Sequence, residues 1–367
     1  MSKAAELANL IGNINAGGGG VNRNVIINGA MNVAQKGTSH TGLGGSTGAV
    51  YTLDRFCTFD SATAGRATVT QDSSAPSGFA NSLKVACTTA DTSIAAGEQF
   101  LLQQRIEGQN LQAFAKGTSS AKPFAVSFYV KGNASATYAC ELFDRDNTRQ
   151  ASKLFNVTTD WTRIELTFDA DTTGAFDDDN ARSLDFIIQL HAGSNYTSGT
   201  LNQTFASNTD ANRAAGISSF FDSTDRTFFI TGVQLEVGQN PTEFEHEPFE
   251  RTLAKCQRYF YAVGFPDKLA SSTNFTMGYY LNSARVDCVI DLPVTMRTTP
   301  SVTANSGTNY FNAYMNGNDY FDTFDAINAA NASNFTIYRS SQLSGTAGDA
   351  VLISKTASAS LSADAEL

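Results

Sequence analysis

The chain has 367 residues, of which 41% are hydrophobic and 16% charged, and its formal net charge is −10. This apolar fraction is enough for hydrophobic cores and excludes general disorder, and the length predicts two domains with a short extra segment. Nucleic acids and anionic lipids bind basic surfaces, so the acidic charge argues against both, and no segment is apolar and long enough for membrane insertion. Three His residues leave little room for imidazole metal sites or catalysis.

The first segment, residues 1–24, predicts a short helix followed by a Gly-rich joint at residues 17–20. Apolar residues recur there at spacings of three and four, which places them on one face of a helix. These residues are Ala4, Leu7, Ile11 and Ile14. A helix of this length is marginal alone, so it either frays or forms a docking or oligomerisation element. Because no signal-peptide core is present, we expect synthesis in a cytoplasm.

In residues 25–248 the spacing of apolar residues changes from the helical pattern to a period of two. Apolar and polar side chains alternate over residues 124–130, 163–168, 184–190 and 229–237, with polar turn clusters between these runs. This alternation is typical of half-buried strands, and the absence of long helical patterns excludes a βαβ sheet. The sequence therefore predicts an all-β protein with an antiparallel jelly-roll β-sandwich.

Within this region we expect particular structural roles for a few side chains. Phe229, Val233, Leu235 and Val237 share one parity and should face the core, which leaves Gln234 and Glu236 facing solvent or a neighbouring chain. The single Trp, Trp161, opens a strand and is expected to be a core anchor rather than a sugar platform. The charged pairs at 54–55 and at 105 and 107 should be paired scaffold charges.

Residues 249–264 predict a connecting helix, because Leu253, Cys256 and Phe260 fall on one helical face. The period of two returns in residues 286–292, 335–337 and 351–353. Residues 265–367 are therefore expected to form a smaller distal β-domain.

The five Cys residues are odd in number and far apart, and no Cys-x-x-Cys pair occurs. Their neighbours are apolar, so we expect buried free thiols in a protein made in a reducing compartment, and no zinc knuckle.

Eight short strings, in this order, resemble a family of bacteriophage tail-fibre and virion structural proteins built on a carbohydrate-binding-module-like jelly roll. They are VIINGAMNVAQKG (25–37), YTLDRF (51–56), QRIEG (104–108), FYVKG (128–132), TDW (159–161), ITGVQLEVG (230–238), TEFEH (242–246) and CQRYF (256–260). The resemblance covers about residues 22–262. Residues 292–300 and 362–367 look like the distal β-domain of such fibres.

This resemblance implies a non-enzymatic structural protein of the virion, a homotrimer that attaches to other virion proteins through its N-terminus and contacts host surface glycan. One alternative is a capsid decoration or head-fibre protein, and another is a glycan-degrading depolymerase. Jelly rolls of this kind often bind a structural Ca²⁺, but the sequence leads us to expect no cofactor and no metal site. Residues 144–147 and 177–180 offer clustered oxygens for Ca²⁺, but without the EF-hand spacing, and Asp and Asn are equally common in turns.

We expect no catalytic residues. A glycosidase needs two carboxylates in a cleft, whereas the acidic clusters at 169–171, 177–179 and 243–250 are typical of solvated turns. A catalytic triad would have to use His40, His191 or His246, and no Gly-x-Ser-x-Gly elbow lies near any of them.

Residues 305–325 interleave aromatic rings with Asn and Asp, a mixture that suits glycan contact because sugars stack on rings and bond to amides and carboxylates. The candidate glycan-binding residues are Tyr310, Tyr314, Tyr320, Asn316, Asn318 and Asp319. We expect Phe311, Phe321 and Phe324 to pack the distal core instead. For the three Tyr rings, surface recognition and core packing both remain open.

Overall fold

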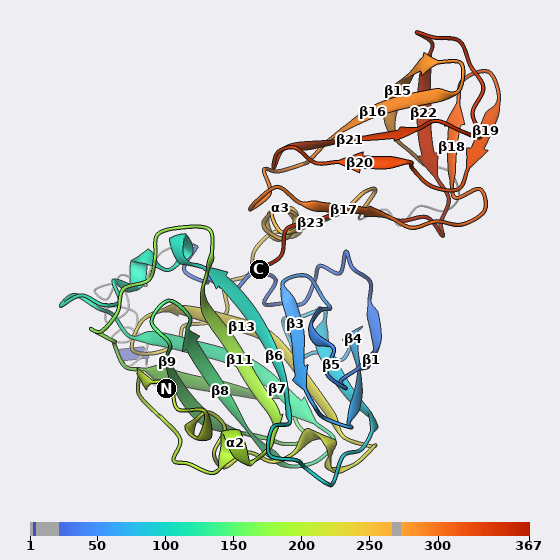
Figure 1. The fold of residues 1–367 in the computed structure, drawn as a ribbon. Coiled ribbons are helices and arrows are strands. Elements are labelled where there is room, and N and C mark those ends of the chain that lie inside the picture. Colours follow the sequence, from blue (N-terminus) through green and yellow to red (C-terminus); the bar gives the residue numbers. More distant parts are fainter. Residues whose placement is uncertain (1–2, 5–21, 266–272) are drawn as a thin grey trace. The chain divides into compact units, whose positions relative to one another are not determined.

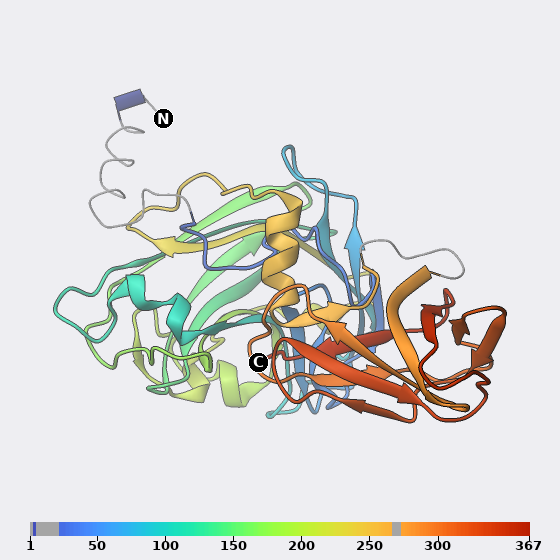
Figure 2. The same cartoon turned by 90° about the horizontal axis from the view of Figure 1, so that it is seen from above.

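A computed structural model describes residues 3–4, 22–265 and 273–367 and shows two compact units built of β-sheet (Figures 1 and 2). The first unit extends to Thr252 and includes the C-terminal Leu367, and the second spans Leu253–Glu366. Lys3 and Ala4 are helical, whereas the docking candidates Leu7, Ile11 and Ile14 lie outside the described residues. None of the helices within those ranges has the length and apolar character that crossing a bilayer requires.

The first unit is an antiparallel sandwich of two sheets. One has the order β1-β4-β5-β13-β7-β10 and the other β12-β9-β8-β11-β6-β3-β2. The strands of the first sheet are β1 (Ser39–Leu43), β4 (Arg66–Asp72), β5 (Ser82–Thr89), β13 (Thr227–Val237), β7 (Phe124–Gly132) and β10 (Thr162–Phe168). Those of the second are β12 (Ala206–Ser207), β9 (Arg149–Val157), β8 (Ala136–Asp144), β11 (Arg182–Ala192), β6 (Gln99–Glu107), β3 (Phe56–Ser61) and β2 (Gly48–Tyr51).

Short helices connect the strands of this unit: η1 (Gly108–Asn110), η2 (Gln112–Phe114), α2 (Ser194–Thr197), η3 (Asp210–Asn212) and η4 (Phe220–Asp222). The all-β class and the jelly-roll sandwich predicted from the period of two are confirmed. The alternating residues of β7 and β11 fill the space between the sheets, with Phe128, Val130, Phe186 and Ile188 fully buried. The five Cys residues are buried free thiols, as expected.

Strand β13 departs from the predicted parity. Phe228 and Ile230 face the core, and the register shifts between Thr231 and Gln234, where Gly232 takes φ +62°. This bulge moves Phe229 to the opposite face from Val233.

The predicted exposure of Gln234 and Glu236 is wrong, because both are fully buried. Glu236 pairs with Arg23 at 3.0 Å and accepts a hydrogen bond from the backbone N–H of Thr242. Chain segments distant in sequence therefore cover this face of the sheet.

Trp161 is not the core anchor that the sequence predicts. Its ring is half-buried and packs edge-on against Phe229, with ring centroids 6.1 Å apart. This contact lies on the outer face of the sheet, to which the bulge directs Phe229. Asp54, Arg55 and Glu107 are at most 1% exposed, whereas the predicted pairing of these charges stays a prediction.

The boundary between the units falls within the helix α3 (Phe249–Gln257), so the second unit contains this helix from Leu253 onward. The rest of the second unit consists of two antiparallel sheets. The helix ends earlier than predicted, because Phe260 already pairs with Asp364. The three-stranded sheet contains β14 (Phe260–Ala262), β23 (Leu361–Asp364) and β17 (Ser301–Ala304). The seven-stranded sheet has, in spatial order, β19 (Asn318–Phe321), β18 (Phe311–Tyr314), β22 (Ala350–Lys355), β15 (Thr273–Asn282), β16 (Arg285–Asp291), β21 (Asn334–Arg339) and β20 (Ala326–Asn328).

One face of this seven-stranded sheet carries the core of the second unit. Phe311, Phe321 and Phe324 pack against one another there as predicted, with ring centroids 4.7–5.6 Å apart. The opposite face bears the site described next.

Candidate functional site

The outer face of the seven-stranded sheet is continuous across strands that are distant in sequence. Directly opposed residues of antiparallel strands point to the same side of a sheet. Tyr314 of β18 pairs with Leu352 of β22, which pairs with Met277 of β15. The register thus places these three side chains in one row, although residues 277 and 352 are far apart in the chain.

A second row on the same face runs from β15 to β21. Tyr279 pairs with Asp287, and Asp287 pairs with Tyr338. Tyr279 lies two positions from Met277, so both rows face the same way. Tyr280 and Cys288, which directly follow Tyr279 and Asp287 in the chain, are buried in the core.

This sheet carries most of the large apolar side chains that the described residues expose. Six of those nine lie on its strands, with exposed fractions that reach 64% for Met277 and 55% for Val289. The six are Met277, Tyr279, Leu281, Val289, Tyr314 and Tyr320. A concentration of exposed apolar side chains on one face is typical of an interaction surface.

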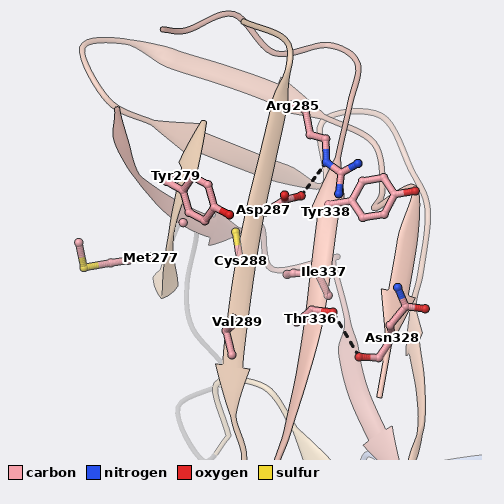
Figure 3. Close-up of a pocket in the computed structure, with 11 residues that line it drawn as sticks. Met277, Tyr279, Arg285, Asp287, Cys288, Val289, Asn328, Thr336, Ile337 and Tyr338 are labelled. Atoms are coloured by element: carbon pink, nitrogen blue, oxygen red, sulfur yellow. Dashed lines mark hydrogen bonds and ion pairs between the residues drawn. The ribbon is translucent and has the colours of Figure 1, made fainter. Parts of the chain in front are cut away.

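The centre of the face forms a groove of about 520 Å³ over β15, β16, β21 and β20 (Figure 3). Its lining comprises Met277, Gly278, Tyr279, Arg285, Asp287, Cys288, Val289, Asn328, Thr336, Ile337 and Tyr338. This volume lies within the range of small-ligand sites, and the lining combines aromatic rings with a few polar groups, as such sites do.

Two contacts fix the polar groups of the groove. The guanidinium carbon of Arg285 lies 3.9 Å from the ring centroid of Tyr338, and Arg285 Nε donates to Asp287 Oδ1 at 2.8 Å. The hydrogen bond to Asp287 raises the pKa of Arg285, so the guanidinium stays charged. The side chains of Arg285 and Asp287 remain 33% and 23% exposed, which leaves polar atoms of both open to a ligand.

The structure brings four of the six predicted glycan-binding residues to one end of this face. Tyr314 and Tyr320 are about half exposed, at 48% and 47%. Asn316 is exposed in the turn between β18 and β19, and Asn318 is exposed opposite Tyr314.

The other two candidates have structural surroundings. Tyr310 is half-buried against the core of the second unit, beside Gly307. The Asp319 carboxylate accepts hydrogen bonds from Tyr280 Oη at 3.1 Å and from the backbone N–H of Ser344 at 2.8 Å. Burial, together with the bond to Asp319, raises the pKa of Tyr280 to about 12. We therefore assign Tyr310 and Asp319 to the scaffold.

Sequence reasoning missed the groove residues Tyr279, Arg285, Asp287, Asn328 and Tyr338. The alternation of Arg285, Asp287 and Val289 with buried residues could have identified one outward row. No local signal shows that β16 lies between β15 and β21, because strand order is set by long-range pairing.

Of the residues considered for Ca²⁺, Asp144 does not fit that ion. Lys116 Nζ lies 2.6 Å from Asp144 Oδ2 and 3.1 Å from Asp171 Oδ2, so an ammonium group already occupies the space between these carboxylates. The acidic residues 177–179 are exposed, as predicted for a solvated turn.

Of the three His residues, His191 alone lies among buried polar groups. Its ring contacts Ser219 Oγ through Nδ1 and Glu98 Oε2 through Nε2, at 2.8 and 3.1 Å. Ser219 Oγ also accepts the N–H of Phe221 at the start of η4, and the imidazole is fully buried. We therefore interpret Ser219 as a cap that orients His191.

No protein-family model matches the chain, and no curated protein matches it. Several solved structures do match the chain. A family 4 carbohydrate-binding module (CBM4) is 10% identical over 57% of this chain and 97% of its own, with a TM-score of 0.30. The enzymatically active domain of tailspike protein 4 of bacteriophage CBA120 is 12% identical over 58% of this chain and 21% of its own, with a TM-score of 0.31.

A family 11 module from Clostridium thermocellum, in complex with a β-1,3-1,4-mixed-linked tetrasaccharide, is 12% identical over 57% of this chain and 98% of its own, with a TM-score of 0.27. At these scores the likeness carries no argument about what this chain binds. That question rests on its own side chains.

Proposed function

We propose that this chain is a non-enzymatic binding protein whose second unit attaches to a neutral surface glycan through the groove of the seven-stranded sheet. The row formed by Tyr279, Asp287 and Tyr338, with Arg285 stacked on Tyr338, is the observation that carries the proposal.

The chemistry of this row matches the surface of a sugar ring. A pyranose has apolar C–H faces, which stack on aromatic rings, and hydroxyl groups, which need acceptors and donors. Tyr279 and Tyr338 supply rings two strands apart, roughly 10 Å by the usual strand spacing. Asp287 supplies an acceptor between them and Arg285 a donor. The face extends beyond the groove to Tyr314, so an oligosaccharide could follow it across several strands.

The charge of the chain favours a neutral ligand. With a net charge of −10, the protein repels anionic polysaccharides at low ionic strength. Within the groove, Arg285 and Asp287 neutralise each other, so the site itself presents no excess charge.

The proposed biological setting is a phage particle, on the basis of the resemblance of residues 22–262 to tail-fibre and virion proteins. In that setting the chain would be a homotrimeric tail fibre or receptor-binding appendage, anchored to other virion proteins through residues 1–24. The head-decoration and depolymerase alternatives give different results in the experiments below.

The test measures binding of the full chain to an array of neutral glucan, galactan and mannan oligosaccharides, with hyaluronate as the anionic probe. Calorimetry then measures the affinity for the neutral oligosaccharide that binds most strongly on the array. We expect Tyr279→Ala and Tyr338→Ala each to lower the affinity by about 1–3 kcal/mol, as truncation of an aromatic anchor does. Phe249→Ala removes an exposed aromatic ring outside the sheet and serves as the matched control.

Two further readouts separate the alternatives. Light scattering reports the oligomeric state: if the Tyr variants dissociate the protein while glycan binding is unchanged, the face is a subunit interface and the glycan proposal is wrong. Release of reducing ends from the bound oligosaccharide would instead support the depolymerase. Wild-type affinity in a variant that combines Tyr279→Ala and Tyr338→Ala would exclude the groove as the binding site.

A further inference from the structure

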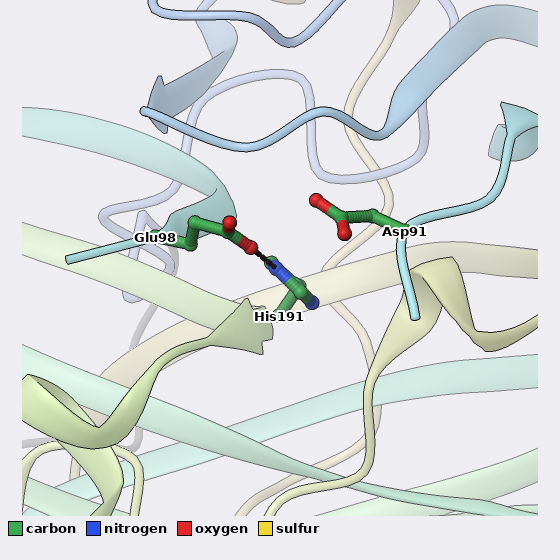
Figure 4. A group of neighbouring side chains, drawn as sticks. All are labelled: Asp91, Glu98 and His191. Carbon is green, nitrogen blue, oxygen red and sulfur yellow. Dashed lines mark hydrogen bonds and ion pairs between the residues drawn. The ribbon is translucent and has the colours of Figure 1, made fainter. Parts of the chain in front are cut away.

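Three buried ionisable side chains meet at one end of the sandwich in the first unit (Figure 4). Asp91 lies in the loop between β5 and β6, Glu98 directly precedes β6, and His191 is near the end of β11. Their exposed fractions are 5%, 4% and 0%. One ligand atom from each lies within 4.8 Å of the others, and Figure 4 shows the two carboxylates and the imidazole directed toward a common point.

The charges in this cluster are not balanced by a basic side chain. Within residues 22–265 and 273–367, neither Asp91 nor Glu98 forms an ion pair with Lys or Arg, and His191 is the single pairing partner. Buried charges are normally paired, because desolvation of an isolated carboxylate is unfavourable. The same sandwich shows the usual solution elsewhere, where Lys116 lies between the buried carboxylates of Asp144 and Asp171.

Asp91 is held as a carboxylate. Burial raises its pKa, but hydrogen bonds from Thr63 Oγ1 and from the backbone N–H groups of Ala64 and Ser93 outweigh burial and keep the pKa below its ordinary value.

The second nitrogen of His191 is fixed in the way that metal sites require. Nδ1 contacts Ser219 Oγ at 2.8 Å, which orients the ring and directs Nε2 to the carboxylates. A hydrogen-bonding partner on the other ring nitrogen is a regular feature of His ligands. The ring also packs edge-on against Phe221, with centroids 5.2 Å apart, so its position is set by packing as well.

We propose that Asp91, Glu98 and His191 bind a Zn²⁺ ion, which ties the β5–β6 loop to the end of β11. Zn–N and Zn–O bonds of about 2.0–2.2 Å place tetrahedral ligand atoms roughly 3.3 Å apart. The 3.1 Å between His191 Nε2 and Glu98 Oε2 already fits. The ligand atom of Asp91 lies within 4.8 Å of the other two and must move toward them by up to about 1.5 Å.

The donor set selects zinc over calcium. Ca²⁺ takes six to eight oxygen ligands, whereas this cluster supplies one nitrogen and two carboxylates, with a water to complete four-coordination. The site is also separate from residues 144–147 and 177–180, where sequence reasoning sought Ca²⁺.

The first experiment uses the full chain, stripped with a chelator and dialysed. We expect ZnCl2 to restore one metal ion per chain, measured by elemental analysis, and to raise the Tm by on the order of 5 °C. CaCl2 at the same concentration should change neither quantity. No zinc uptake, or an equal response to CaCl2, would overturn the proposal whether or not any variant folds.

The second experiment compares variants. His191→Gln and Asp91→Asn should each lower the zinc affinity by more than about tenfold. His246→Gln removes an exposed imidazole elsewhere and should bind zinc as the wild type does. Asp171→Asn perturbs the cluster around Lys116, so it is expected to alter stability without altering the response to zinc. Wild-type zinc affinity in His191→Gln would contradict the proposal.

Discussion

The guanidinium carbon of Arg285 lies over the Tyr338 ring, 3.9 Å from its centroid, while Arg285 Nε donates to Asp287 on the same strand, β16, which lies between β15 and β21. One arginine thus fixes both an aromatic ring and a carboxylate at the floor of the groove. The planar guanidinium is suited to this double role, and a Lys ammonium is not.

We therefore expect Arg285→Lys to weaken binding of the neutral oligosaccharide by about 0.5–2 kcal/mol, since it keeps the charge but loses the stacking plane. Calorimetry on the full chain measures the change. Arg339→Lys alters an arginine of the same unit that pairs with Asp325 at 2.7 Å outside the groove, and it should retain wild-type affinity. Equal losses in the two variants would show that the effect is not specific to the groove.

Trp161→Ala is expected to lower the free energy of unfolding by only about 1–2 kcal/mol, because the ring is half-buried and contacts Phe229 from outside the core. Phe128→Ala, which empties a fully buried position between the sheets, should lower it by about 3–5 kcal/mol. Denaturant titrations that follow the first unit give both values. A larger effect for Trp161 than for Phe128 would contradict the structure.

Lys116→Met should lower the free energy of unfolding by about 3–5 kcal/mol, because it leaves the buried carboxylates of Asp144 and Asp171 without their shared cation. The control is Lys84→Met, which breaks a partly exposed pair with Asp72 at 3.6 Å. That pair should contribute less than about 1 kcal/mol. Chemical denaturation of both variants at neutral pH makes the comparison, and similar values for the two would argue against the buried network.

The same network predicts acid sensitivity. Burial raises the pKa of Asp171, but hydrogen bonds from Arg149, Thr173 and Lys116 outweigh it and hold the pKa below the ordinary value of 3.8. The unfolded state therefore binds more protons near that pH, so the contribution of Asp171 is complete above pH 3.8 and is lost as the pH falls through the folded-state pKa.

Asp171→Asn should accordingly flatten the decline of stability below pH 3.8, by up to about 1.4 kcal/mol per pH unit. Denaturant titrations at a series of pH values give the slope. An unchanged slope in the variant would show that Asp171 does not titrate in this range.

Local sequence patterns were sufficient for the strands and for much of the two cores. The alternation at Phe128 and Val130 predicts which side of β7 is buried, because successive side chains of a strand point to opposite faces. The apolar neighbours of the Cys residues likewise predicted buried thiols, and Phe311, Phe321 and Phe324 were correctly assigned to the distal core. These features depend only on period and residue type.

The tertiary structure decided everything that depends on which strands become neighbours. The bulge at Gly232 reversed the parity of Phe229, and distant segments buried Glu236. Pairing of β16 with both β15 and β21 placed Asp287 between Tyr279 and Tyr338. The register between strands decides which side chains lie side by side on a face. The alternation within one strand cannot specify that register, because it depends on pairing with distant segments. The cluster of Asp91, Glu98 and His191 arises for the same reason. The pairing of β6 with β11 brings Glu98 and His191 together across about 90 residues of sequence, and residues so far apart form no recognisable metal-binding motif.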